Sequence, residues 1–363
     1  MPVCLPRIKM RSRMRQLLRA TILLWVCFFP SLPPGVLFAA ESPEIPRGVF
    51  SLSALKEPAD GSVLTNPLVD GISIRQAWRE LERSPGAYSW NFLDSEVSRA
   101  ARAGKVVLLR VLSEGPATPK WALDGVQMFR YGDRNRYHGE RSGLIAVYWD
   151  KTYLARKKAM IQAVGAHFSG NPAVRLVAAI CASSHSGDWA VPHSRFDIAN
   201  WHAIGYSPDK MIDVCKQIID VTMQSFPQQC VTLAVGRNGR LDPDPNYVAR
   251  AVVQYASSHY PGRFIVQKNS LAASTPLPGA PDLKHFEMLN ESGPDVAGQM
   301  LWYSYGDPTV RNNGGGGPSD PEATLRRAVD IGLAYRMKYI EIYERDVLHL
   351  PGVIRYAHDA LVK

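Results

Sequence analysis

The sequence predicts a (β/α)8 barrel, and three observations lead to that prediction. Short apolar segments alternate with longer segments of helical periodicity, which is the order of a parallel sheet joined by crossover helices. Eight such strand candidates are present, the number that closes a barrel. The roughly 320 residues that follow residue 40 fit one barrel with insertions. The strand candidates are residues 47–52, 71–77, 105–112, 174–182, 230–235, 263–269, 298–304 and 338–343.

Helical patterns separate most of the strand candidates, and their first turns carry start signals. Pro208 and Pro321 each fall in a first turn, behind Ser207 and Asp320 as N-caps. Residues 52–71 show no helical pattern, so we expect only a loop in the first unit. The predicted helices are residues 91–103, 151–168, 207–225, 246–260 and 321–336.

The first 40 residues have the pattern of a signal peptide. Six Lys and Arg residues precede a short apolar run at 20–29, and Pro30 then interrupts this run. The run is well under the ~20 residues that span a bilayer, so cleavage is a better interpretation than an anchor. We therefore expect an exported protein, periplasmic or secreted, with residues 41–363 as a single barrel domain and no transmembrane segment after cleavage.

The basic charge belongs mostly to this leader. Removal of its six basic residues reduces the number of Lys and Arg residues from 42 to 36. The number of Asp and Glu residues stays at 33, so the net charge falls from +9 to about +3. This small excess argues against a nucleic-acid partner, which needs a clustered basic face. The oligomeric state stays open.

Three cysteines follow the leader: Cys181, Cys215 and Cys230. Buried free thiols are the simplest interpretation, and a Cys215–Cys230 disulfide is the alternative for an exported chain. No C-x-x-C pair and no H-E-x-x-H spacing occurs, so the sequence predicts neither a metal site nor a cofactor.

A motif within residues 72–189 resembles a known enzyme family. The pattern W-x-x-L-E-x-x-P-G-x-Y-x-W-x-x-L-D runs from Trp78 to Asp94, and P-K-W follows at residues 119–121. It resembles the barrel of the family 42 β-galactosidases and related retaining glycoside hydrolases. This resemblance implies a sugar-facing barrel, with a Glu at the end of strand 4 as general acid and a Glu at the end of strand 7 as nucleophile.

The catalytic positions depart from that pattern. Asp188 is the carboxylate near the end of the fourth strand, and Gln299 stands on the seventh, where a Gln cannot attack an anomeric carbon. The second carboxylate must then come from elsewhere, with Glu341 as first candidate and Glu287 or Glu291 behind it. A separation of ~5–5.5 Å would suit a retaining pair and ~6.5–9.5 Å an inverting pair.

Strand alternation predicts which side chains face the barrel interior. In the last strand Ile340 and Ile342 would pack on the helices, which turns Glu341 inward. Glu341 is then either a catalytic carboxylate or part of a structural Arg–Glu network. By the same logic the other inward or rim residues are Ser73, Arg75, Arg110, Tyr339 and Tyr343.

Further candidates lie in the long segments 114–149, 183–206, 272–294 and 305–318, which follow strands at the C-terminal face. Arg75 matches a strand-2 arginine that orients the nucleophile in the related barrels. His185 could tune Asp188 or bind a hydroxyl, and nearby serines lack the G-x-S-x-G elbow of a serine hydrolase. Trp side chains can stack on sugar rings. The candidate sugar-binding tryptophans are Trp121, Trp149, Trp189 and Trp302, with Trp201 beside them.

The sequence thus favours a glycoside hydrolase acting on an oligo- or polysaccharide. The alternative is a barrel that binds glycans without catalysis, its nucleophile lost at Gln299. A third hypothesis, a structural role in envelope polysaccharide export, predicts an exposed apolar patch instead of a cleft.

Overall fold

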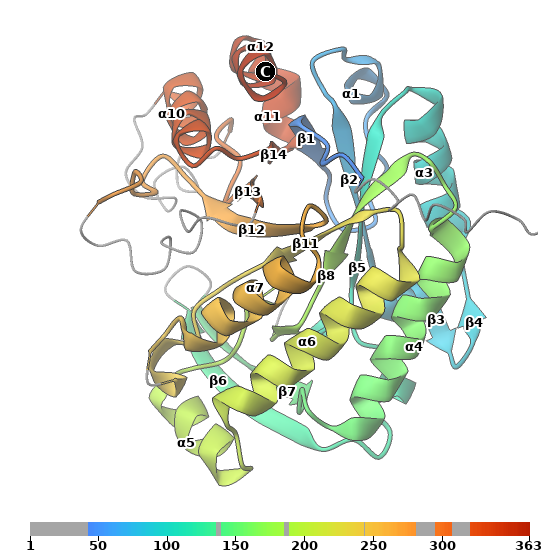
Figure 1. The fold of residues 1–363 in the computed structure, drawn as a ribbon, viewed down its shortest axis with the longest axis vertical. Helices are drawn as coiled ribbons and strands as arrows, with labels where there is room; N and C mark the ends of the chain where they lie inside the picture. The colour runs from blue at the N-terminus through green and yellow to red at the C-terminus, as the bar shows by residue number, and fades with distance from the viewer. Residues whose placement is uncertain (1–42, 136–138, 185–188, 243, 281–294, 307–319) are drawn as a thin grey trace, which may run out of the picture. The chain divides into compact units, whose positions relative to one another are not determined.

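A computed structural model describes residues 43–135, 139–184, 189–242, 244–280, 295–306 and 320–363. Eight parallel strands form a closed barrel in the order β1-β14-β13-β12-β11-β8-β5-β2, so the predicted (β/α)8 fold is confirmed. Figure 1 shows the helices on the outside of this barrel. The strands are β1 (Gly48–Leu52), β2 (Gly71–Ala77), β5 (Val106–Leu112), β8 (Val174–Ala179), β11 (Cys230–Ala234), β12 (Phe264–Leu271), β13 (Asp295–Met300) and β14 (Tyr339–Tyr343).

The seventh strand begins and ends earlier than predicted. The sequence indicated 298–304, whereas β13 ends at Met300. The Leu301 N–H still donates to the Leu271 carbonyl oxygen of β12, but the backbone N–H groups of Ser304 and Tyr305 donate to the Asp346 carboxylate instead of a neighbouring strand. A buried carboxylate far along the chain thus ends this strand, which an apolar window cannot reveal.

The helices between the strands agree with the sequence, and their caps explain where they begin. Ser207 accepts a hydrogen bond from the Lys210 N–H, and Asp320 accepts one from the Glu322 N–H. The first unit is different from its prediction, because α1 (Gly61–Thr65) forms a short helix capped by Asp60. The other crossover helices are α3 (Asn91–Arg102), α4 (Lys151–Phe168), α6 (Pro208–Ser225), α7 (Tyr247–His259), α10 (Pro321–Ala334) and α12 (Pro351–Leu361).

Insertions at the carboxyl ends of the strands carry further elements. After β5, the strands β6 (Met128–Asn135) and β7 (Gly139–Ala146) pair as an antiparallel hairpin. After β8 comes α5 (Arg195–Ala203), and α11 (Glu344–His349) follows β14 directly. Figure 1 shows the hairpin and α5 on the same side of the barrel, where they pack together.

The hydrophobic core has two layers separated by the barrel wall. The outer layer packs strand side chains such as Ile340 and Ile342 against the helices. The inner layer fills the barrel with one residue from most strands, so it is packed rather than open. The inner residues are Phe50, Leu108, Leu176, Cys230, Ile265, Ala297 and Tyr339.

These layers explain why the Cys215–Cys230 disulfide expected as an alternative does not form. Cys230 points into the barrel, whereas Cys215 lies on α6 in the outer layer. The barrel wall separates the two thiols, and both are free and buried, as is Cys181.

Two kinds of feature are absent from the described residues. None of their helices is long and apolar enough to cross a bilayer. They contain no group of three or more His, Cys, Asp or Glu side chains arranged to hold a metal ion.

Candidate functional site

A charged pair lies inside the barrel, one layer above the apolar filling. Glu341 on β14 points inward and is 0% exposed, and Arg110 on β5 reaches across the barrel to it. The Arg110 Nη1 and Nη2 atoms donate to the two carboxylate oxygens of Glu341 at 3.0 and 2.9 Å. The predicted inward orientation of Tyr339, Glu341 and Arg110 is therefore what the structure shows.

Neutral side chains complete the surroundings of this pair. Gln267 on β12 donates from Nε2 to Glu341 Oε1 at 2.8 Å, and Tyr339 Oη donates to Gln267 Oε1 at 2.7 Å. Arg110 Nη1 also donates to the Ser73 hydroxyl at 3.2 Å. Four strands, β2, β5, β12 and β14, thus contribute side chains to one buried network inside the barrel.

The network controls the proton affinity of Glu341. Burial raises the pKa of this carboxyl, but the charge and hydrogen bonds of Arg110, helped by Ser73 and the more distant Arg75 charge, lower it further than burial raises it. The net result is a pKa below the ordinary value of 4.5. Glu341 is therefore an ionised carboxylate at neutral pH, with both oxygens occupied.

Arg75 lies nearer the mouth of the barrel. Its side chain is half-buried, and Nε donates to the Ser53 carbonyl oxygen at 3.0 Å. The Ser53 hydroxyl in turn donates to Glu344 Oε2 at 3.0 Å, which ties the exits of β1 and β14 together. Arg75 thus stands beside the charged pair as predicted, close enough to lower the Glu341 pKa.

Of the other candidate positions on or near the strand ends, Gln299 is among the described residues. Gln299 on β13 pairs in register with Glu341 on β14, so a neutral amide lies next to the inner carboxylate. Asp188, His185, Glu287 and Glu291 lie outside the described residues. Their proposed roles stay predictions.

Two of the candidate tryptophans anchor the loops that hold them. The Trp121 ring N–H donates to the Glu82 carbonyl oxygen at 3.1 Å, and its ring meets Trp78 edge to face. The Trp189 ring N–H donates to Asn238 Oδ1 at 3.1 Å. Both indole N–H groups are therefore already used within the protein.

Trp149 belongs to an aromatic cluster beneath the β6–β7 hairpin. Its ring lies 5.5 Å from the fully buried Trp201, and the Lys210 ammonium lies 5.4 Å above it. Trp302 follows β13 at the mouth and, like Trp121, Trp149 and Trp189, is half-buried.

Sequence reasoning missed a second buried charged pair. Glu114 follows β5 directly, is 3% exposed, and pairs with Lys157 of α4. Tyr153 Oη also donates to Glu114 Oε2 at 2.8 Å. Burial raises the pKa of Glu114, and the Lys157 charge offsets only part of this effect. A Glu immediately after a barrel strand is the sequence signal that could have revealed it.

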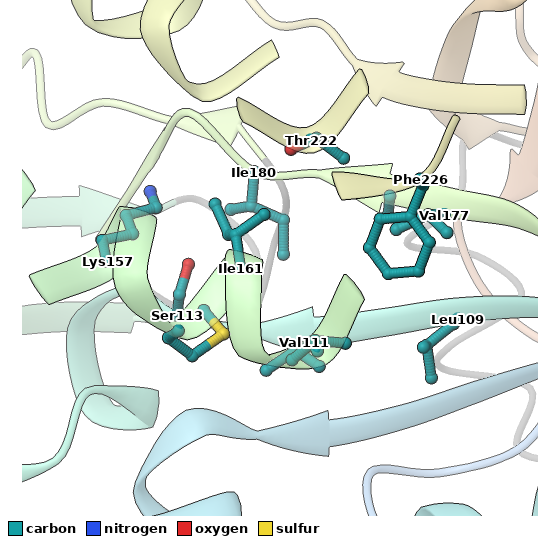
Figure 2. Close-up of a pocket in the computed structure, with 12 residues that line it drawn as sticks. Leu109, Val111, Ser113, Lys157, Ile161, Val177, Ile180, Thr222 and Phe226 are labelled. Carbon is teal, nitrogen blue, oxygen red and sulfur yellow. The ribbon is translucent and has the colours of Figure 1, made fainter. Parts of the chain in front are cut away.

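A cavity of about 30 Å³ lies beside Lys157, between the barrel wall and the helices. Figure 2 shows its lining, with Val111 and Val177 from the strands and Ile161 and Phe226 from α4 and the end of α6. Its lining is mostly apolar, with Ser113, Lys157 and Thr222 as the polar members, and it includes none of the inward residues of the charged network. These properties suit a packing defect rather than a sugar site.

Comparison with known proteins adds family information for part of the chain. Residues 64–179 match the family model described as beta-galactosidase of glycoside hydrolase family 42. No curated protein matches the chain.

Solved structures share the fold at low identity. The catalytic domain of β-amylase from Paenibacillus polymyxa is 8% identical, with 88% of this chain and 99% of that chain covered and a TM-score of 0.57. The β-galactosidase from the psychrophilic Marinomonas ef1 is 12% identical, covering 82% of this chain and 53% of that one, with a TM-score of 0.47. The β-galactosidase from Bacillus circulans sp. alkalophilus is 12% identical, with 82% and 50% covered and a TM-score of 0.49.

These identities show the fold alone, and the chain spans about half the length of the two β-galactosidases. The family match covers β2, β5 and β8, which are the second to fourth strands of the closed barrel. The chain is a glycoside hydrolase-like (β/α)8 barrel that resembles the family 42 β-galactosidases over residues 64–179.

Proposed function

We propose that this barrel hydrolyses a glycosidic bond in an oligo- or polysaccharide. The observation that carries the proposal is the overlap between the matched segment, residues 64–179, and the strands that place Arg75 and Arg110 inside the barrel. Arg110 bonds to an ionised carboxylate, Glu341, below the mouth, and the charge of Arg75 helps to lower its pKa. Most glycoside hydrolases use a pair of carboxylates at the scissile bond, and Glu341 would be one of them.

In this proposal Asp188 protonates the leaving oxygen and Glu341 attacks the sugar or activates water. The low pKa of Glu341 suits either role, because a nucleophile or a base must be ionised. Its oxygens, however, are both bonded to Arg110. The reaction therefore needs this ion pair to open, or it needs Glu287 or Glu291 as the second carboxylate.

A specific observation also favours a second function, carbohydrate binding without catalysis. Glu341 is 0% exposed, and Gln299 stands beside it where the related hydrolases have their nucleophile. A buried Arg–Glu pair of this kind can serve only to hold the barrel together. A sugar bound at the mouth would then meet no ionised attacking group.

Hydrolysis of a glycan panel by the purified protein separates these functions. We expect Asp188→Asn and Glu341→Gln each to reduce turnover by about 10²–10⁴-fold, while Asp359→Asn, an exposed residue of α12, has no effect. Denaturant unfolding of each variant shows that a loss is not a folding defect. Glycan binding without turnover in the wild-type protein would refute the hydrolase and support the binding barrel.

Export of the protein is also our proposal. It is supported by the basic and apolar pattern of residues 1–40. N-terminal sequencing of the protein from fractionated cells should find a new N-terminus near residue 41 outside the cytoplasm. An intact N-terminus in the cytoplasmic fraction would contradict it.

A further inference from the structure

Aromatic rings line the rim of the barrel where β13 and β14 end. Tyr343 at the end of β14 meets Tyr303 edge to face, with ring centroids 6.2 Å apart. Farther along, Tyr305 stacks on His349 of α11 at 4.2 Å, with the planes only 12° apart. We call Tyr303, Tyr305, Arg345 and His349 the rim cluster.

The rim cluster contains a cation that its neighbours hold in place. The Arg345 guanidinium lies 4.8 Å above the Tyr303 ring. It also passes close to the backbone at Gly306, where a Cβ atom would come within 2.4 Å of Arg345 Nη2. Gly306 has φ +116°, which L side chains rarely adopt, so the backbone there favours glycine. The guanidinium is thus packed against both the Tyr303 ring and the backbone at Gly306.

The backbone beneath the rings is equally well defined. The Asp346 carboxylate is 0% exposed and accepts hydrogen bonds from the Ser304 N–H at 2.8 and 2.7 Å and from the Tyr305 N–H at 2.7 Å. These bonds hold the chain between Tyr303 and Tyr305 against the start of α11. The rings are therefore preorganised, and binding would order few additional groups.

The exposure of the rim cluster is what distinguishes it from a structural stack. Tyr305 is 37% exposed, and Arg345 and His349 are exposed as well. By contrast, Trp90 stacks on two rings of the protein, Tyr88 at 5.0 Å and His167 at 4.2 Å. Both neighbours are nearly parallel to Trp90, at 12° and 8°, as in a structural stack.

We propose that the rim cluster is a carbohydrate-binding subsite that takes one or two pyranose units of a glycan chain extending outward from the barrel mouth. The tyrosine rings would pack on the apolar C–H faces of the sugars, and Arg345 would donate to ring hydroxyls or to a sugar carboxylate. The cluster follows β13 and β14, so it borders the mouth that holds Glu341. The inference rests on the proposed carbohydrate-active function and adds the place where a longer substrate is held.

Affinity electrophoresis of the purified protein in gels with β-1,4-galactan, xylan or polygalacturonate tests the subsite without requiring turnover. We expect Tyr305→Ala and Arg345→Ala each to weaken binding by about five- to tenfold, and Tyr305→Phe to keep it because the ring remains. The chain offers a matched control in Arg326, which lies 3.8 Å above Tyr356 on the outer helices. Arg326→Ala and Tyr356→Ala should leave the affinity unchanged.

The outcomes separate this inference from the proposed function. Glycan binding that is unchanged in Tyr305→Ala and Arg345→Ala overturns the subsite while leaving a carbohydrate-active barrel intact. Equal weakening for galactan and polygalacturonate assigns Arg345 to hydroxyls, and weakening for polygalacturonate alone assigns it to a carboxylate. Absence of binding to every glycan, together with no turnover, refutes the subsite and the proposed function alike.

Discussion

Two buried ion pairs in this protein each join a Glu to a basic side chain, but the pKa values of the two Glu carboxyls are shifted in opposite directions. Arg110–Glu341 lies inside the barrel, and Lys157–Glu114 lies between the wall and α4. All four side chains are almost completely buried. Yet the pKa of Glu341 lies below its ordinary value and the pKa of Glu114 lies above it.

The difference comes from the partners. Arg110 binds both oxygens of Glu341 with a planar fork, and Gln267 donates a further bond. Glu114 has the single ammonium of Lys157 and the hydroxyl of Tyr153, which do not outweigh the cost of burial. The two-oxygen contact with Arg110 thus outweighs the effect of burial at Glu341, and an ionised carboxylate is what a catalytic nucleophile or base needs.

The largest expected effect on stability comes from removing the Arg110 guanidinium. Arg110→Leu should destabilise the protein by about 3–5 kcal/mol, because Glu341 would remain buried without its cation. Urea unfolding measures the loss, and the exposed Arg102→Leu of α3 is the control, within about 0.5 kcal/mol of wild type. A similarly small change in Arg110→Leu would contradict the importance of the inner pair.

A smaller loss should follow from breaking the outer pair. Lys157→Met should cost about 2–3 kcal/mol, because Glu114 can take up a proton more readily than Glu341 can. The same urea unfolding experiment applies, with the exposed Lys120→Met as control. If Lys157→Met lost more stability than Arg110→Leu, the ranking of the two pairs would be reversed.

The pH dependence should separate the pairs by sign. Glu341 has a lowered pKa, so its contribution to stability is present above pH 4.5 and is lost as the pH falls through its folded pKa. Glu114 has a raised pKa, so its contribution is full below pH 4.5 and is lost as the pH rises through its folded pKa.

Comparing wild type with Glu341→Gln and Glu114→Gln in urea, from about pH 3.5 to pH 7, checks this prediction. The advantage of wild type over Glu341→Gln should shrink below pH 4.5, and its advantage over Glu114→Gln should grow from neutral pH down to pH 4.5. Each change amounts to about 1.4 kcal/mol per unit of pKa difference. Parallel curves for the two variants would show that the pKa values are shifted in the same direction.

The smallest effect concerns the cavity that accompanies only the outer pair. Val164→Ile of α4 should fill part of this space and stabilise the protein by about 0.5–1 kcal/mol. Val252→Ile of α7, which is buried away from the cavity, should instead destabilise by overpacking. Thermal unfolding compares them, and equal destabilisation in both would mean that the cavity cannot accept a methyl group.

Several features of the site could be predicted from local sequence. Alternation along the last strand correctly separated the outward Ile340 and Ile342 from the inward Glu341. The end of β13 differed from its prediction, because the Ser304 N–H beyond that strand donates to Asp346, which lies 42 positions away. Alternation also could not show that the indole N–H groups of Trp121 and Trp189 bond within the protein.

The sequence by itself determined the eight strands, the positions of the main helices and the inward orientation of the charged residues, because periodicity and caps are local properties of the chain. Only the tertiary structure decided which charges meet, since Arg110 and Glu341 lie 231 residues apart and become neighbours when the barrel closes. The same closure put the wall between Cys215 and Cys230, and gathered Tyr303, Tyr305 and Arg345 at one rim. Contacts of this kind depend on strand order and register, which are set by packing of the whole barrel and not by any segment alone.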